Sequence, residues 1–242
     1  MENLVQEKIG DIVAKNFHAA AVFSKYGMDF CCGGQKSVQE VATKKGVDLS
    51  KLEQELCDVL EKPQTGQIDY TAWPADLLAA YIEKTHHRYV REKTPTILAY
   101  LNKLCQVHGG RHPELLEINQ LFQESAKDLG QHLVKEERIL FPFIMQLVNS
   151  KIDRTQAEKP AFGTVENPIH MMEDEHDAEG ERFARIAELT DNYTVPADGC
   201  STYRVTYEML KEFEDDLHKH IHLENNILFP KSIALERESN MA

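Results

Sequence analysis

Two segments of this chain repeat one another, and each combines an imidazole with a carboxylate. His132 and Glu136 lie four residues apart, as do His220 and Glu224, and the two pairs are separated by 88 residues. The tetrapeptide Ile-Leu-Phe-Pro follows soon after each glutamate. In an α-helix, residues i and i+4 share one face. Two such helices facing each other would surround a small volume with nitrogen and oxygen donors, which predicts a site for two metal ions.

One further histidine precedes each copy of the repeat. His87 lies 45 residues before His132, and His176 lies 44 residues before His220. Each half therefore predicts a helix with one histidine, a connection, and a second helix with the histidine–glutamate pair. A repeat of this length is too long for a solenoid unit. It is typical of a duplicated helical hairpin that forms a four-helix bundle, in which sites are built from core-facing side chains.

Helical periodicity and turn residues divide the chain into two predicted units. Residues 1–66 form a small helical domain that ends in a linker at residues 62–66, and residues 67–242 form the bundle. The four long helices of the bundle are predicted over residues 74–104, 113–144, 168–189 and 201–229. Pro95 is expected to kink the first, Pro142 to bend the second and Pro230 to limit the fourth. No segment of useful length alternates with a period of two, so the predicted fold is all-α.

The ligand candidates lie within the apolar stripes of these helices, where an unpaired charge would be costly. The other core positions of the stripes are Leu129, Ile139, Phe143, Ile169, Met172, Phe183, Ile186, Leu210, Phe213, Leu217, Ile227 and Leu228. His218 and His222 share a face with charged residues and are predicted to face solvent. A core without metal would have to bury two carboxylates and four imidazoles unaided.

The same helical periodicity assigns the remaining histidines to the core or to the surface. His86 and His87 are adjacent, so only one is expected to face the core, and periodicity alone leaves both alternatives open. The histidines predicted to lie at the surface are His18, His108, His112 and His170. The first helix of the bundle therefore contributes one ligand candidate of undecided identity.

A pair of cysteines, Cys31 and Cys32, lies in a glycine-rich turn and is expected outside the core. Two interpretations stay open, a reactive thiol pair or small residues that suit a tight turn, because thiol reactivity depends on pKa and exposure. Cys57, Cys105 and Cys200 are expected to be structural. Five cysteines without the spacing of a zinc site are typical of a reducing compartment.

Charge and hydropathy exclude several classes of partner. The formal net charge is −13 over 242 residues, which argues against nucleic acid or an anionic membrane surface as the main partner. No apolar run approaches the length needed to cross a bilayer, and the first 30 residues lack a signal-peptide pattern. We therefore expect a cytoplasmic protein.

Four segments together resemble the Repair of Iron Centers family of di-iron proteins. Residues 26–34 read Tyr-Gly-Met-Asp-Phe-Cys-Cys-Gly-Gly, which is similar to the N-terminal signature of that family. Residues 173–177 and the two histidine–glutamate segments are similar to its bundle signatures. The resemblance covers nearly the whole chain and implies a hemerythrin-like four-helix bundle behind a small N-terminal helical domain.

The resemblance also implies the metal and its ligands. The family holds two non-haem iron ions, oxo- and carboxylate-bridged, with four histidines and two bridging glutamates. These ligands fall on His87, His132, Glu136, His176, His220 and Glu224, with His86 as the alternative to His87. The donors are nitrogen and oxygen alone, which suits iron or manganese. The resemblance further implies that Cys31 and Cys32 take part in redox transfer or in handing iron onward.

The function that the resemblance implies is repair of iron–sulfur clusters damaged by nitric oxide or peroxide. Its partners would be damaged iron–sulfur proteins, with nitric oxide or oxygen as small ligands. Two alternatives stay open: a sensor or carrier of oxygen or nitric oxide, and an enzyme that reduces nitric oxide at the di-iron centre. Iron donation and nitric oxide removal are both compatible with the sequence. The oligomeric state also stays open, a homodimer being one alternative.

Overall fold

A computed structural model describes residues 4–61 and 68–241 of the chain, and all regular elements in these ranges are helical. The described residues contain a single isolated bridge, between Lys8 and Ser37, and no strand. The predicted all-α class is therefore confirmed. The chain divides into two compact units, one with residues 1–78, 147–158 and 219–242, the other with residues 79–146 and 159–218.

The first unit contains the N-terminal helices. The helices of this part are α1 (Ile9–Lys15), α2 (Ala19–Lys25), α3 (Val38–Lys45) and α4 (Leu49–Leu60), with the short turns η1 (Leu4–Gln6) and η2 (Tyr70–Ala72). Ser37 and Glu40 form a capping box at the start of α3, and Asp48 caps α4, so unpaired N–H groups at both helix starts are satisfied. The apolar faces of these helices meet in a core that includes Ile9, Phe23 and Leu52. The predicted linker at residues 62–66 lies outside the described residues.

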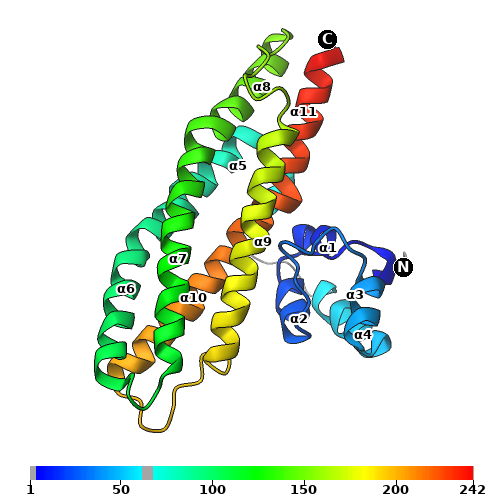
Figure 1. The fold of residues 1–242 in the computed structure, drawn as a ribbon. Coiled ribbons are helices and arrows are strands. Elements are labelled where there is room, and N and C mark those ends of the chain that lie inside the picture. Colours follow the sequence, from blue (N-terminus) through cyan, green and yellow to red (C-terminus); the bar gives the residue numbers. More distant parts are fainter. Residues whose placement is uncertain (1–3, 62–67, 242) are drawn as a thin grey trace. The chain divides into compact units, whose positions relative to one another are not determined.

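The bundle is built from long helices interrupted by π-helical turns (Figure 1). Its elements are α5 (Ala75–Ile82), η3 (Glu83–His87), α6 (Arg88–His108), α7 (Glu114–Lys135), η4 (Glu136–Leu140), α8 (Phe141–Asp153), α9 (Glu166–Leu189), α10 (Ser201–Leu223), η5 (Glu224–Leu228) and α11 (Phe229–Met241). Helix α7 packs against both α6 and α9 in the second unit. No described helix has the length and hydropathy required to cross a membrane.

Pro230 acts differently from the prediction, which expected it to limit the fourth helix, whereas Pro142 was expected only to bend the second. Pro142 and Pro230 do not end their helices, because α8 continues to Asp153 and α11 to Met241. Each proline is the second residue of a helix that follows a π-helical turn. Directly after a π-helical turn the regular backbone hydrogen-bond pattern is already interrupted, so the missing N–H of a proline is tolerated there. Pro95 lies inside α6, which continues past it to His108.

The π-helical turns also explain an error in the predicted core. Ile139 was expected to be buried but is 49% exposed, whereas its neighbour Leu140 is buried. Both residues belong to η4, where one turn holds an additional residue and the face of each following side chain shifts. The remaining predicted core positions of the stripes are buried. A pattern of constant period 3.6 could not predict this local shift.

Three predictions about the histidines are wrong. His86 and His87 are both buried, although only one was expected to be, because they lie at the end of the π-helical turn η3. His222 was expected to face solvent but is buried. His108 was expected at the surface and is also buried. His170 lies at the surface of α9, as predicted.

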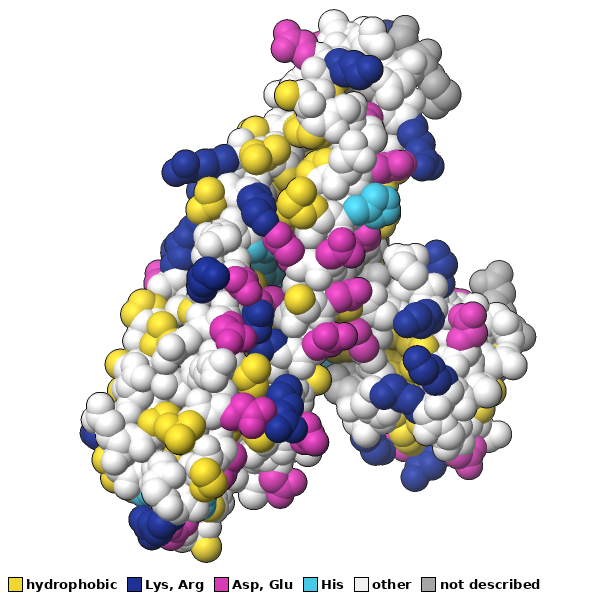
Figure 2. All heavy atoms as spheres, in the orientation of Figure 1, with side chains coloured by type: hydrophobic (Ala, Val, Ile, Leu, Met, Phe, Trp, Pro, Cys, Tyr) yellow, Lys and Arg dark blue, Asp and Glu magenta, His cyan; other side chains and the backbone are white. Residues whose placement is uncertain are grey.

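The exposed faces of the helices carry charges of both signs. Figure 2 shows acidic and basic side chains interspersed on one face of the molecule.

An aromatic cluster fills the core of the second unit. The ring of Phe213 stacks on Phe183 at 5.6 Å between centroids and meets Phe122 edge-on at 5.3 Å. All three side chains are among the largest that are fully buried. We therefore expect these contacts to hold three of the bundle helices in register.

Truncation of this cluster should destabilise the bundle measurably. Phe213→Ala removes a buried ring and leaves a cavity, so we expect a loss of about 3–5 kcal/mol in the free energy of unfolding. Val205→Ala on the same helix is the matched control, since Val205 is 41% exposed. Urea denaturation followed by circular dichroism measures both values. A loss for Phe213→Ala no larger than for Val205→Ala would contradict the assigned core.

Candidate metal centre

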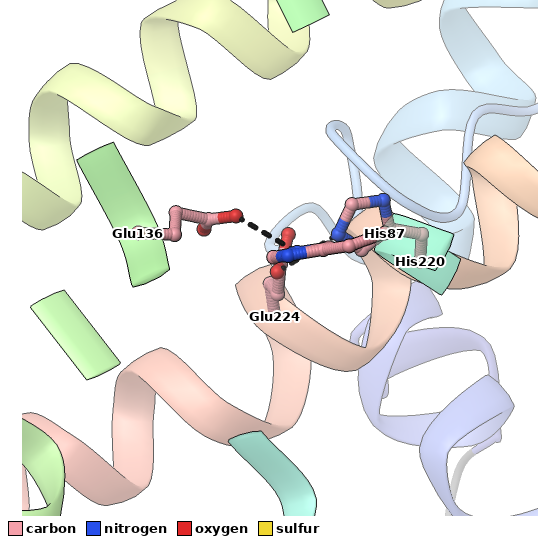
Figure 3. Close-up of side chains that lie close together, drawn as sticks. All are labelled: His87, Glu136, His220 and Glu224. Atoms are coloured by element: carbon pink, nitrogen blue, oxygen red, sulfur yellow. Dashed lines mark hydrogen bonds and ion pairs between the residues drawn. The ribbon is translucent and has the colours of Figure 1, made fainter. Parts of the chain in front are cut away.

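The ligand candidates form two overlapping groups of buried side chains. The first group is His87, Glu136, His220 and Glu224, drawn in Figure 3, and the second is His132, Glu136, His176 and Glu224. Within each group, one ligand atom from every residue lies within 4.8 Å of the others. The two groups share both glutamates, so each carboxylate lies between two sets of imidazoles.

The distances between individual atoms show how the side chains converge. Glu136 Oε2 lies 3.3 Å from Nε2 of His87 and 3.3 Å from Nε2 of His132. His176 Nε2 lies 3.1 Å from His132 Nε2. On the C-terminal helix, His220 Nε2 lies 3.0 Å from Glu224 Oε1. Each repeat therefore aims its imidazole and carboxylate at one point, as the spacing of four residues predicts.

The chemistry and burial of these side chains fit two metal ions. Both glutamates are 0% exposed, and the four histidines are no more than 3% exposed. Burying two carboxylates so close together is costly unless positive charge compensates them. The donors are imidazole nitrogen and carboxylate oxygen without sulfur, a set that suits first-row metals such as iron or manganese. Two shared carboxylates with two histidines at each end could hold two metal ions.

Two further glutamates hold ligand imidazoles in place. Glu137 Oε1 lies 2.8 Å from Nδ1 of His87, and Glu175 Oε2 lies 2.9 Å from Nδ1 of His132. Such a carboxylate fixes the ring orientation and leaves Nε2 available to a metal. Sequence reasoning did not assign this role to either residue. The sequence feature that could have identified them is their position next to a ligand candidate: Glu137 follows Glu136, and Glu175 precedes His176.

The charges around these two carboxylates keep them ionised. Hydrogen bonding to His132, assisted by Lys135, lowers the pKa of Glu175 to about 2 despite its partial burial. Burial alone would raise the pKa of Glu137, but hydrogen bonds from Arg91 and His87 lower it below its usual range. Both groups are therefore anionic at neutral pH. They favour the ring tautomer with a proton on Nδ1, which exposes the Nε2 lone pair.

The structure distinguishes the two adjacent histidines of the first bundle helix. His87 belongs to the first ligand group. His86 is equally buried, but its Nδ1 lies 2.9 Å from Oδ1 of Asp216, outside both groups. The π-helical turn η3 buries both rings and directs them to different partners. His87 is thus the residue placed with Glu136, and His86 contacts helix α10.

A cavity of about 230 Å³ reaches the second ligand group from the side of α7 and α9. His132, His176, Glu175 and Lys135 are among its lining residues. One water occupies about 30 Å³ of liquid volume, so the cavity is large enough for a diatomic molecule together with water. The cavity therefore borders the two imidazoles of the second group and the Glu175 carboxylate.

The cysteine pair is less exposed than predicted. Cys31 is 3% exposed, which corrects the expectation that it lies outside the core, and Cys32 is partly exposed. Their sulfur atoms lie 3.7 Å apart, and Cys31 Sγ lies 3.1 Å from Oδ1 of Asp29. The hydrogen bond with Cys32, burial and the Asp29 charge together raise the pKa of Cys31 well above its usual value. Cys31 is therefore held as a protonated thiol.

The fold and the two ligand groups define a helical cation-binding protein with histidine and glutamate clusters suited to two metal ions. Comparison with known families agrees with this class. Residues 78–232 match the model described as hemerythrin HHE cation binding domain. Residues 5–60 match ScdA_N, described as a domain of unknown function (DUF542).

Individual relatives extend over nearly the full chain. The chain is 34% identical over 228 residues to the iron-sulfur cluster repair protein YtfE of Musicola paradisiaca, covering 94% of this chain and 96% of the relative. It is 35% identical to YtfE of Enterobacter sp., over 95% and 98% of the two chains. A probable iron-sulfur cluster repair protein of Haemophilus influenzae is 34% identical, over 95% and 97%. The chain belongs to this family of iron–sulfur cluster repair proteins with a hemerythrin bundle.

The orienting role of Glu175 can be tested separately from the ligands. Glu175→Ala should weaken metal binding by roughly 10- to 100-fold, because the His132 ring loses the partner of its Nδ1. Glu173→Ala is the matched control, since Glu173 lies on the same helix and contacts the exposed His170. Competition with a chromogenic chelator measures the affinity. Equal affinities in the two variants would show that Glu175 does not orient the ligand.

Proposed function

We propose that this protein holds two non-haem iron ions and repairs iron–sulfur clusters damaged by nitrosative or oxidative stress. The observation that carries the proposal is the sharing of Glu136 and Glu224 by two ligand groups. Two carboxylates shared by both groups are what a carboxylate-bridged pair of ions would require. Relatives that are 34–35% identical over nearly their whole length bear the name of iron–sulfur cluster repair proteins.

In this proposal each ion has its own pair of histidines. His87 and His220 would hold one ion, His132 and His176 would hold the other, and both ions would share the carboxylates of Glu136 and Glu224. A bound di-iron pair would supply ions that change oxidation state and exchange small ligands. The chain itself orients the imidazoles through Glu137 and Glu175 and excludes bulk water by burial.

The cavity beside the centre and the cysteine pair support two kinds of partner, a small diatomic ligand and a damaged iron–sulfur protein. The cavity beside His132 and His176 supports access of nitric oxide or oxygen to the second ion. Cys31 and Cys32, in the N-terminal domain over residues 1–66, support a step that involves thiols, such as transfer of iron or of reducing equivalents to a damaged iron–sulfur protein. All five cysteines are free thiols, which supports a cytoplasmic, reducing location.

A second candidate function is reduction of nitric oxide at the same centre. The cavity supports it, because a catalyst must admit its substrate to an open metal position. A simple carrier or sensor is less well supported, since it would need only the bundle at residues 67–242 and not the thiol pair.

Ligand substitutions should separate metal binding from surface effects. His220→Ala and Glu224→Ala should each lose most of the iron and lower the melting temperature, because metal binding contributes to the free energy of folding. His218→Ala is the control on the same helix, since His218 is partly exposed and belongs to neither group. Iron analysis should give about two ions per chain in the control. Equal iron loss in all three variants would contradict the ligand assignment.

Repair itself can be measured with a purified iron–sulfur enzyme whose cluster has been damaged by nitric oxide. The iron-loaded protein should restore client activity and cluster absorption, whereas Glu224→Ala should not, because it lacks the bridging carboxylate. Free ferrous iron at the same concentration is the second control. Recovery no greater than with free iron would argue against a repair function, and rapid formation of nitrous oxide without recovery would favour the reductase.

A further inference from the structure

The two copies of the repeat diverge directly after their glutamates. In the first copy, Glu136 is followed by Glu137 and Arg138, and in the second, Glu224 is followed by Asn225 and Asn226. Glu137 serves the centre by holding His87. The two asparagines contact a different part of the chain. The divergence therefore gives the second copy a task that the first does not have.

Both asparagine side chains donate hydrogen bonds to the backbone of the cysteine loop. Asn226 Nδ2 lies 3.2 Å from the carbonyl oxygen of Phe30 and 3.2 Å from that of Cys31. Asn225 Nδ2 lies 3.4 Å from the same Cys31 oxygen. These residues all belong to the first compact unit. The turn that contains Glu224 thus holds the loop that contains the thiols.

Two glycines make room for the Asn226 side chain. A Cβ at Gly34 would lie 2.5 Å from Asn226 Oδ1, and a Cβ at Gly10 would lie closer still. The N–H of Gly10 also donates to the carbonyl of Gly34 at 2.8 Å, which joins the two sides of the socket. Any larger residue at either position would push Asn226 away. The socket is therefore shaped for this amide.

Aromatic contacts close the socket on its remaining side. The His222 ring lies 5.9 Å from the rings of both Phe17 and Phe30 between centroids. Its Nδ1 lies 3.1 Å from Asn226 Nδ2. The burial of His222, which the helical pattern did not predict, follows from this packing. The hydrogen bonds of Asn226 are thereby partly buried, which makes them stronger than fully exposed ones.

We propose that Asn225 and Asn226 form a latch that fixes the Cys31–Cys32 loop against the Glu224 turn and so keeps the Cys31 thiol closed to reagents. Both asparagines are positioning residues that act through the backbone of Phe30 and Cys31. The latch itself does not depend on the proposed function. One consequence does: if Glu224 is a metal ligand, loading of the metal orders the latch turn, and thiol protection is coupled to metal occupancy.

The test is alkylation of the full-length, iron-loaded protein by N-ethylmaleimide, with the rate at each cysteine resolved by mass spectrometry. Asn226→Ala should raise the rate at Cys31 about tenfold, because the loop opens more often once its hydrogen bonds are lost. Gly10→Ala should do the same from the other side of the socket, without substituting any residue of the turn that carries Glu224. Arg138→Ala, the equivalent position in the first copy, should leave the rate unchanged.

Cys57 serves as the internal reference, because it lies in α4 of the same N-terminal domain. An unchanged rate at Cys57 together with faster labelling of Cys31 supports the latch. Parallel increases at both cysteines would mean that the domain unfolds, and a Cys31 rate within twofold of the wild type in both socket variants would mean that the asparagines do not hold the loop. Either result overturns the proposal.

Removal of iron by a chelator tests the coupling. We expect Cys31 labelling in the wild-type protein to rise several-fold, with a smaller further rise in Asn226→Ala, where the latch is already open. No effect of the chelator on the wild type would overturn the coupling. A protein that binds no iron at all would contradict the proposed function, and the comparison among Asn226→Ala, Gly10→Ala and Arg138→Ala would still decide the latch.

Discussion

The burial of two glutamates among four histidines is the constraint on which the bundle depends. Glu136 and Glu224 have no exposed surface, and the ligand atoms of each group lie within 4.8 Å of one another. Two carboxylates at such a distance repel each other and lose their hydration, so the arrangement favours bound cations. Burying the two carboxylates costs free energy of folding. Metal binding at the site would offset this cost, because it adds to the free energy of folding, and the aromatic contacts of the second unit add to it as well.

The sequence alone could predict the helices, the duplicated hairpin and the core stripes. These features depend on the 3.6-residue period and on repeat spacing, which are local properties of the chain. It could not predict the turns η3, η4 and η5, because a π-helical turn conflicts with that period. Three errors coincide with these turns: the exposure of Ile139, the burial of both His86 and His87, and the continuation of the last helix past Pro230.

The π-helical turns coincide with the ligand candidates. His87 is the last residue of η3, Glu136 the first of η4 and Glu224 the first of η5. Such turns are frequent at functional sites, because a widened turn reorients side chains that a regular helix would direct elsewhere. The additional residue has a local cost, which the buried polar contacts of the site can offset. The spacing of the repeat predicted the ligand candidates, and the structure supplies the geometry that brings their side chains together.

Duplication also explains how one helical motif came to serve two tasks. In the first copy, the residue after the glutamate is Glu137, which orients His87 within the second unit. In the second copy, the equivalent residue is Asn225, and with Asn226 it holds the backbone beside Cys31. A buried carboxylate facing backbone carbonyls would be repelled by them, whereas an amide donates to them. The change from acid to amide is therefore what allows the second copy to contact the thiol loop while keeping the same histidine and glutamate.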